Sequence, residues 1–299
     1  MSEEGKVHDR GDVSPDPAKV AVAMPAARPK QQTDFGITKI PQQQFMKVLL
    51  YGDSGVGKTR LSATADDCEE MRPVLYCDSD VGIMTISHRT ELDYKKLESL
   101  DDAFDVLRLV RLHPARYRTV ILDGLMSLYT RVMADRLRLA KDKPGHDAYV
   151  PVMQDWLHCQ FRMRALLSAF RDQPINFVAT TCAALERTGE EEGVVTIVPD
   201  LPGKLADQVG QMFDIVGYLY VRAVGRKITR MLQIQPFHRV IAKNRSPYSD
   251  VMGPIIEEPT MSAMYHAALL GDTAAVHPQT ADKSSRMRAT DESETDKGE

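Results

Sequence analysis

The chain has 299 residues, a formal net charge of -4 and 27% charged side chains, which excludes the globally basic surface of proteins that bind nucleic acid by charge alone. No apolar stretch approaches membrane-spanning length and the first residues lack the apolar centre of a secretory signal, so we expect a cytoplasmic protein without a membrane partner. The four cysteines form no CxxC pair, which predicts reduced thiols. The eight histidines show no HExxH and no zinc-binding spacing, so no metal is expected other than one held by the nucleotide.

Composition divides the chain into three parts. Residues 1–34 are rich in Pro, Ala and charge and have no apolar period, which predicts a disordered arm. Residues 272–299 end in the mostly acidic run DESETDKGE and are expected to be a second disordered segment. Such a run is typical of a solvated tail, and an interaction tail for a partner or a basic groove is the alternative. Residues 35–271 have the size of a single domain.

The first predicted strand, 46–51, leads directly into the motif G-x-x-x-x-G-K-[ST]. The eight motif positions are Gly52, Asp53, Ser54, Gly55, Val56, Gly57, Lys58 and Thr59. A helix is predicted from Lys58 onward, and a strand, a glycine-rich loop and a helix in this order make a phosphate-binding loop. A glycine-rich turn with a surface lysine is the alternative, which this flanking order disfavours.

The residue types in this loop suit a nucleoside triphosphate. Glycines let backbone N–H groups approach phosphate oxygens without an intervening Cβ, and a helix start presents further N–H donors. Lys58 can reach the β- and γ-phosphates, and the Thr59 hydroxyl can ligate the Mg²⁺ that bridges them. The sequence therefore predicts a nucleotide bound with Mg²⁺ in this loop.

The next strands end in carboxylates. Strand 73–77 is followed by Asp78-Ser79-Asp80, and strand 118–123 ends in Asp123. Because a carboxylate at the C-terminal edge of a parallel strand faces the crevice where ligands bind, Asp123 is predicted to hold the metal through water. The alternative is that Asp123 only caps the helix that follows it.

The remaining elements alternate at first and then change character. Helices are predicted over 100–112, 125–139 and 152–170, with a polar break at 141–149 and a strand over 175–180. Three β-rich runs follow at 214–224, 227–235 and 238–243, with Gly225-Arg226 as a hairpin turn, and a helix over 261–270 closes the core. This order predicts an α/β fold with a mostly parallel central sheet, helices on both faces and an antiparallel β extension on the C-terminal side.

With these elements in place, the chain resembles the RecA-like P-loop NTPases. More narrowly, it is similar to the phage-encoded AAA-type nucleotide-binding proteins associated with single-strand annealing and recombination. The resemblance covers about 47–256 and is carried by YGDSGVGKT, PVLYCDSD, TVILDG, INFVATT, PDLPGKLADQV before FDIVGYLY, and VIAKNRSPY. The first segment is specific only for P-loop NTPases in general. The last narrows the choice, because RecA-type proteins carry a similar K-N-K/R after a late strand.

The resemblance implies catalytic roles. RecA-like enzymes end the strand after the first helix in D-x-E, whose Glu polarises the attacking water, and Asp80 takes that position here. Asp80 is one methylene shorter, and a positioning error of about 1 Å can cost on the order of 10²-fold in rate, so hydrolysis is less firmly predicted than binding. Either Thr180 or Thr181 matches the sensor of the γ-phosphate, and Thr181 is preferred.

Lys243 and Arg245 match the family's late basic pair, which reaches the γ-phosphate of a neighbouring subunit. The resemblance therefore implies a homo-oligomer, either a ring or a filament, because a cation supplied to a neighbour's site acts as an arginine finger does. The alternative is two solvated basic residues after a strand.

The resemblance also implies contacts with single-stranded DNA through the loops 141–149 and 182–194. The first loop offers phosphate-binding and stacking side chains at Lys141, Lys143, His146 and Tyr149. The second holds Arg187 among the carboxylates of Glu186, Glu190, Glu191 and Glu192, which repel a phosphate backbone. Two polar surface loops are the alternative. Local positive charge is added by Arg108, Arg111, Arg116 and Arg118.

The sequence thus predicts an ATP-binding, ATP-hydrolysing RecA-like protein that acts on single-stranded DNA in phage recombination or replication. It would work in the host cytoplasm, together with a recombination or single-strand-binding partner. ATP is preferred to GTP because no N-K-x-D signature follows the strand that ends in Asp123. Two alternatives stay open: a nucleotide-dependent conformational switch with little turnover, and a P-loop kinase.

Overall fold

The computed structural model describes residues 45–141, 147, 149–187, 195–272 and 276, all within the unit Gln43–Glu299. The predicted arm, 1–34, lies outside the described residues, as does all of the predicted tail except residues 272 and 276. No helix in the described part of the chain is long and apolar enough to cross a membrane.

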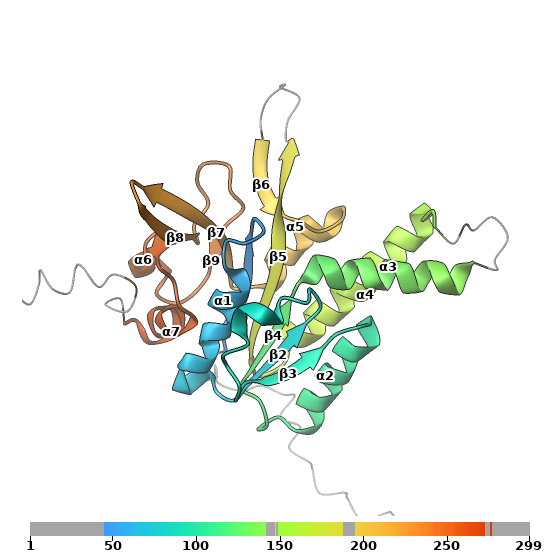
Figure 1. Cartoon of the computed structure of the whole chain (residues 1–299), viewed down its shortest axis with the longest axis horizontal. Helices are drawn as coiled ribbons and strands as arrows, with labels where there is room; N and C mark the ends of the chain where they lie inside the picture. The colour runs from blue at the N-terminus through green and yellow to red at the C-terminus, as the bar shows by residue number, and fades with distance from the viewer. Residues whose placement is uncertain (1–44, 142–146, 148, 188–194, 273–275, 277–299) are drawn as a thin grey trace, which may run out of the picture. The chain divides into compact units, whose positions relative to one another are not determined.

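A single sheet forms the centre of the described domain, with the order β10-β8-β7-β1-β5-β4-β2-β3 (Figure 1). Its parallel strands are β1 (Lys47–Gly52), β2 (Val74–Asp78), β3 (Asp93–Lys96), β4 (Thr119–Asp123), β5 (Asn176–Arg187) and β7 (Ile215–Val224). The antiparallel strands are β6 (Val195–Pro199), β8 (Lys227–Gln233), β9 (Lys243–Asn244) and β10 (Ile255–Glu257). The predicted α/β class, with a mostly parallel sheet and an antiparallel extension, is confirmed.

Helices cover both faces of the sheet. Side chains alternate across β1, so that Leu49 and Tyr51 face one apolar cluster while Val48 and Leu50 face the other. The first cluster is completed by α2 (Leu100–Leu112), α3 (Leu125–Ala140), α4 (Met153–Arg171) and α5 (Lys204–Met212). The second is completed by α1 (Lys58–Ala63), α6 (Ser249–Met252), α7 (Met261–Tyr265) and the helical turns Thr64–Asp67, Glu69–Met71, Ile83–Ile86 and His266–Leu270.

Local sequence explains why the best-predicted helix begins where it does. The Ser99 side chain accepts a hydrogen bond from the backbone N–H of Asp102, and the Asp102 side chain accepts one from the backbone N–H of Ser99. This reciprocal capping box satisfies N–H groups that have no partner inside the helix. The helix begins at the next residue, Leu100, and its bounds agree with the prediction.

Two predictions are corrected. The strand over 238–243 is wrong except at its last residue, because His238 and Arg239 have left-handed φ angles of 52° and 57° that interrupt an extended chain. The loop over 182–194 is also wrong in its first part, because β5 continues as a strand to Arg187 and pairs with β6. The hairpin turn at Gly225-Arg226, between β7 and β8, is confirmed.

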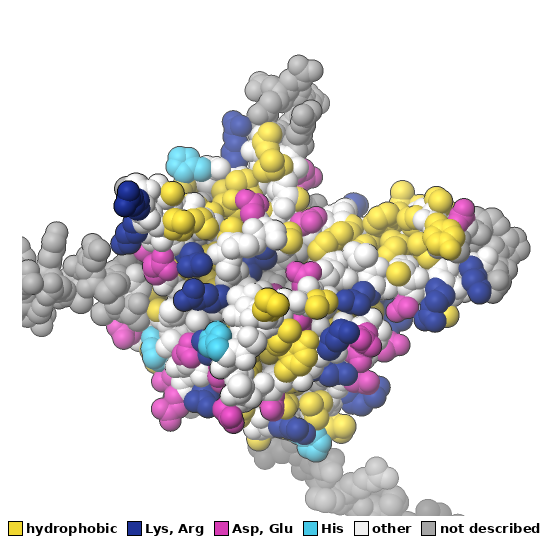
Figure 2. All heavy atoms as spheres, in the orientation of Figure 1, with side chains coloured by type: hydrophobic (Ala, Val, Ile, Leu, Met, Phe, Trp, Pro, Cys, Tyr) yellow, Lys and Arg dark blue, Asp and Glu magenta, His cyan; other side chains and the backbone are white. Residues whose placement is uncertain are grey.

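The surface of α4 carries an apolar stripe, which we define as Met153, Leu157 and Phe161. These side chains are spaced by one helical turn and are 71%, 58% and 63% exposed. Figure 2 shows apolar atoms along the arm that α3 and α4 form, whereas basic and acidic side chains are interspersed over the rest of this face. The apolar stripe is therefore a candidate surface for contact with another protein.

Candidate nucleotide-binding site

The phosphate loop joins the end of β1 to the start of α1. Gly57 precedes the helix with a φ of 104°, a backbone conformation that residues other than glycine rarely adopt. The Lys58 Nζ donates to the backbone carbonyls of Gly52 and Asp53, both at 2.8 Å, so the ammonium lies along the loop. Oxygen atoms of a bound phosphate would offer Nζ the same kind of acceptor.

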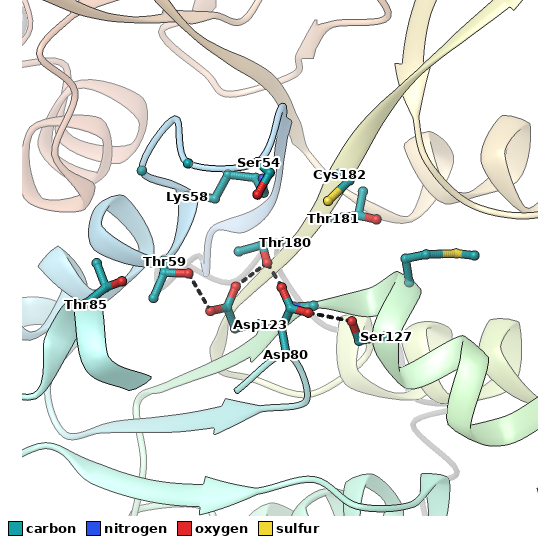
Figure 3. A pocket seen from close by; sticks show the side chains of 14 residues that line it. Ser54, Lys58, Thr59, Asp80, Thr85, Asp123, Ser127, Thr180, Thr181 and Cys182 are labelled. Carbon is teal, nitrogen blue, oxygen red and sulfur yellow. Dashed lines mark hydrogen bonds between the residues drawn. The ribbon is translucent and has the colours of Figure 1, made fainter. Parts of the chain in front are cut away.

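A cavity of about 210 Å³ opens beside this loop. Figure 3 shows that side chains from several elements point into it. The lining residues discussed below are Lys58, Thr59, Asp80, Asp123, Gly124, Ser127, Thr180 and Thr181. The structure thus brings the predicted phosphate loop, metal ligands, catalytic aspartate and sensor threonines to one place.

Asp123 lies at the floor of the cavity and its side chain is the centre of a hydroxyl network. Its Oδ2 accepts hydrogen bonds from Thr59 at 2.8 Å and from Tyr76 at 2.5 Å, and its Oδ1 accepts one from Thr180. Asp123 is only 4% exposed, and this desolvation raises the pKa of its carboxyl group although the three hydroxyl donors act in the opposite direction. A divalent cation at this carboxylate would favour the ionised form and offset the cost of burial.

The position of Asp80 is set by hydrogen bonds that could not be predicted from the sequence. Its Oδ1 accepts a hydrogen bond from Ser127 Oγ at 2.6 Å, and its backbone N–H donates to Asp78 Oδ1 at 2.7 Å. Gly124 follows Asp123 with a φ of 90°, and a Cβ built there would stand 2.8 Å from the Cβ of Asp80. Only glycine at position 124 therefore leaves room for Asp80 beside the carboxylate of Asp123.

The two sensor candidates on β5 differ in their contacts. Thr180 donates to Asp123 and accepts from the backbone N–H of Gly124 at 3.0 Å, so its hydroxyl belongs to the network. The Thr181 hydroxyl donates to the carbonyl of Asp200 at 2.9 Å. Both line the cavity, and the preference for Thr181 as the sensor stays a prediction.

The back of the phosphate loop is held by Arg230 on β8, a residue that the sequence analysis missed. Arg230 Nε donates to the carbonyl of Val56 at 3.2 Å and lies close against Gly57. The backbone N–H of Arg230 donates to Glu258 at 2.8 Å. No local motif could have indicated this contact, because it depends on the pairing of distant strands.

The late basic pair lies outside the cavity. Lys243 is paired with Val216 near the start of β7, whereas the phosphate loop follows the opposite end of the neighbouring strand β1. Lys243 Nζ donates to the carbonyls of Gly210 and Phe213 at 2.7 and 2.8 Å, and Arg245 forms an ion pair with Asp214 at 3.1 Å. Any contact of these cations with a γ-phosphate would have to occur in a neighbouring copy.

The predicted DNA loops are described only in part. Lys141 is exposed at the end of α3 and Tyr149 is 90% exposed, but Lys143 and His146 lie outside the described residues. In the second segment, Glu186 and the exposed Arg187 belong to β5, and 188–194 lie outside the described residues.

The phosphate loop after a central parallel strand, with the buried Asp123 two strands away, defines a P-loop NTPase of the RecA-like class. A family model described as "AAA domain" matches residues 44–246, and the chain belongs to this family. The family assignment agrees with the predicted AAA-type, RecA-like core.

Solved structures with a similar fold include a KaiC-like protein from Pyrococcus horikoshii OT3, with 14% identity, a TM-score of 0.40, and coverage of 72% of this chain and 90% of that one. The flagellar accessory protein FlaH from Methanocaldococcus jannaschii has 10% identity, a TM-score of 0.37, and coverage of 73% and 87%. No curated protein matches the chain.

Proposed function

We propose that this chain binds ATP together with Mg²⁺ and hydrolyses it. One observation carries the proposal: Thr59 Oγ1 and Asp123 Oδ2 meet at 2.8 Å in the cavity that Lys58 and Asp80 also line. A hydroxyl and a carboxylate are the oxygen donors that Mg²⁺ takes from a P-loop protein, and the loop supplies the backbone for the phosphates. The residues present therefore fit the nucleotide and its metal.

The contacts suggest a role for each residue in binding and hydrolysis. When bound, Mg²⁺ would neutralise the negative charge of the phosphates. Thr59 and Asp123 would hold it, and Lys58 would exchange its loop carbonyls for phosphate oxygens. Asp80 would orient the attacking water: Ser127 fixes its Oδ1, and within the described residues its Oδ2 accepts no hydrogen bond. Thr181, or Thr180 through Asp123, would respond to the γ-phosphate.

The proposal extends to single-stranded DNA and to a homo-oligomer, a ring or a filament, in phage recombination or replication. The hairpin of β5 and β6 supports a link between DNA and nucleotide, because β5 carries Thr180 and Thr181 and runs past its last pairing with β1, Gly52 with Cys182 (Figure 1). The apolar stripe on α4 and the exposed Arg245 support association between copies.

A nucleotide-dependent switch with little turnover is the second candidate. It is favoured by Asp80, whose carboxylate is one methylene shorter than the glutamate that RecA-like enzymes use at this position. If water is held too far from the phosphorus, binding would still order the loop while hydrolysis stayed slow.

Phosphate release by the purified full chain, with and without single-stranded DNA, tests the proposal. Lys58→Ala should reduce turnover about 10²–10³-fold, the size of effect for one preorganised donor. Lys204→Ala, which removes an exposed lysine at the start of α5, is the matched control and should leave turnover unchanged. Turnover that rises with DNA supports the full proposal. Tight ATP binding without turnover in either condition selects the switch.

A further inference from the structure

A second group of metal-ligating side chains lies apart from the nucleotide cavity. Cys68 and Glu70 follow the turn Thr64–Asp67, and His266 is the first residue of the π-helical turn His266–Leu270. One ligand atom from each of the three residues lies within 4.8 Å of the other two. Cys68 Sγ is 3.3 Å and His266 Nε2 is 3.2 Å from the same oxygen, Oε2 of Glu70.

We propose that Cys68, Glu70 and His266 bind a transition-metal ion of the zinc type. A tetrahedral zinc ion with bonds of about 2.0–2.3 Å places its ligand atoms about 3.5 Å apart, close to the two separations seen here. A thiolate, an imidazole and a carboxylate all ligate zinc, whereas Mg²⁺ selects oxygen ligands only. The site is therefore chemically distinct from the Mg²⁺ site at Thr59 and Asp123.

The burial of the three groups suits an ion with one open position. Cys68 is buried, whereas the side chains of Glu70 and His266 are 43% and 29% exposed. Solvent can therefore reach the outer side of the cluster and supply a water as the fourth ligand. When the metal binds, the Cys68 thiol loses its proton to solvent, and the covalent S–H bond is replaced by a bond between sulfur and the metal.

The position in the fold suggests a structural role. The segment 64–71 continues from α1, whose first turn completes the phosphate loop, and His266 continues from α7 near the end of the described chain. The two segments already touch, because the backbone N–H of Met261 donates to Thr64 Oγ1 at 2.8 Å. A shared ion would join the closing helix to the helix of the nucleotide site. The π-helical turn at His266 supports this, since such turns are frequent at functional sites.

No motif in the sequence indicates this site, and the expectation that no metal binds apart from the nucleotide rested on histidine motifs and spacing alone. Cys68 and Glu70 are separated by one residue, and the histidine comes from the far end of the domain. Zinc motifs in sequence depend on close spacing of at least two cysteine or histidine ligands. A ligand set assembled only by tertiary packing does not meet that criterion.

Titration with Co²⁺ tests the proposal. The full chain, purified without a histidine tag and stripped with a chelator, should develop a thiolate-to-cobalt charge-transfer absorption that saturates at one ion per chain and is abolished by Zn²⁺. Cys68→Ser should lose the absorption and His266→Gln should weaken binding. Cys182→Ser, which removes a partly buried thiol on β5, should leave it unchanged. Cys182 also lines the nucleotide cavity, so an unchanged signal in Cys182→Ser shows that the absorption does not come from a metal bound there.

Thermal unfolding provides a second measurement. Zinc at one hundred times its Kd should raise the Tm of the wild-type chain by about 5–10 °C, because an ion that binds only the folded state stabilises it by mass action. Cys68→Ser should show no such rise, while its Tm in chelator shows whether it folds. The proposal is overturned if the wild-type chain gives no charge-transfer absorption and no Tm shift, or if both persist in Cys68→Ser.

Discussion

The hydroxyl of Thr59 donates a hydrogen bond to Oδ2 of Asp123 at 2.8 Å, although 64 residues separate the two in the chain. Thr59 is the last residue of the phosphate-loop motif and lies in the first turn of α1, and Asp123 lies at the end of a strand on the far side of β5. The contact therefore exists only when the sheet is assembled in its observed order. It places the two predicted metal ligands at hydrogen-bonding distance from each other.

Asp123→Asn should lose turnover by at least about 10²-fold, because the predicted metal ligand is removed. It should also change the pH dependence of stability in chelator without nucleotide. Burial raises the pKa of Asp123 above its ordinary 3.8, so the stability associated with this group is full below 3.8 and is lost as pH rises through the folded-state pKa. Urea unfolding should show the variant gaining stability relative to wild type over that range. A difference independent of pH would contradict this.

Tyr76→Phe removes the hydroxyl that donates to Asp123 Oδ2. We expect Mg²⁺ affinity in the presence of nucleotide to fall about 10–100-fold, as for other groups that orient a metal ligand. Tyr51→Phe is the matched control, since Tyr51 is an equally buried tyrosine whose hydroxyl donates to the carbonyl of Ile241. Both variants should lose about 0.5–1.5 kcal/mol of stability, but only Tyr76→Phe should need more Mg²⁺ for half-maximal turnover. If both variants need the same Mg²⁺ concentration for half-maximal turnover, Tyr76 does not orient the metal ligand.

Gly124→Ala should both destabilise the fold and reduce turnover. The added methyl group would lie 2.8 Å from the Cβ of Asp80, in a backbone conformation that costs about 1–3 kcal/mol for other residues. Gly225→Ala provides the comparison, because a methyl group in that hairpin turn meets no atom within 4 Å. Denaturation should show a loss in both variants, with turnover reduced in Gly124→Ala alone. Reduced turnover in both would mean that displacement of Asp80 is not the cause.

Asp80→Asn should keep ATP binding and lose hydrolysis by about 10²–10⁴-fold, the range for removal of a general base. Asp80→Glu should hydrolyse ATP faster than wild type, because it restores the methylene that places the carboxylate nearer the water. Single-turnover measurements at saturating ATP separate chemistry from binding. Wild-type rates in Asp80→Asn would exclude Asp80 from the reaction.

The two late cations should behave differently. Lys243→Ala should cost about 1–3 kcal/mol of stability, because the carbonyls of Gly210 and Phe213 lose their donor. Arg245→Ala removes an exposed ion pair with Asp214 and should cost less than about 1 kcal/mol. If Arg245 completes a neighbour's site, its loss should lower turnover only at protein concentrations where copies associate. Unchanged turnover of Arg245→Ala at every protein concentration would contradict the predicted role of Arg245 as an arginine finger.

The features that could be predicted are those determined by neighbouring residues. The phosphate loop and Asp123 each follow a short apolar strand, and the ends of parallel strands meet at one edge, so their proximity followed from local order. Helix 100–112 was predicted with its observed bounds because its apolar period and its cap agree. Short or polar elements were missed, including β3, whose residues DYKK are mostly exposed and show no alternation.

Other features depend on contacts between distant segments. Tyr76 and Arg230 reach the site from strands whose neighbours in the sheet are fixed only by the completed topology. The mistaken strand over 238–243 contains Val240 and Ile241, which favour β structure, yet among the described residues Val240 forms only one isolated bridge, to Ile197. Tertiary packing of this segment overrides its local preference.

β5 is a single unbroken strand from Asn176 to Arg187, and the hydroxyl of Thr180 lies on Asp123. An extended chain rises about 3.3 Å per residue, so the tip of this strand stands roughly 23 Å from Thr180 with no hinge between them. A displacement of Arg187 at the tip would therefore tilt the whole of β5 and change the hydrogen bond between Thr180 and Asp123. One continuous strand therefore connects a distant exposed point to the oxygen atoms of the candidate metal site.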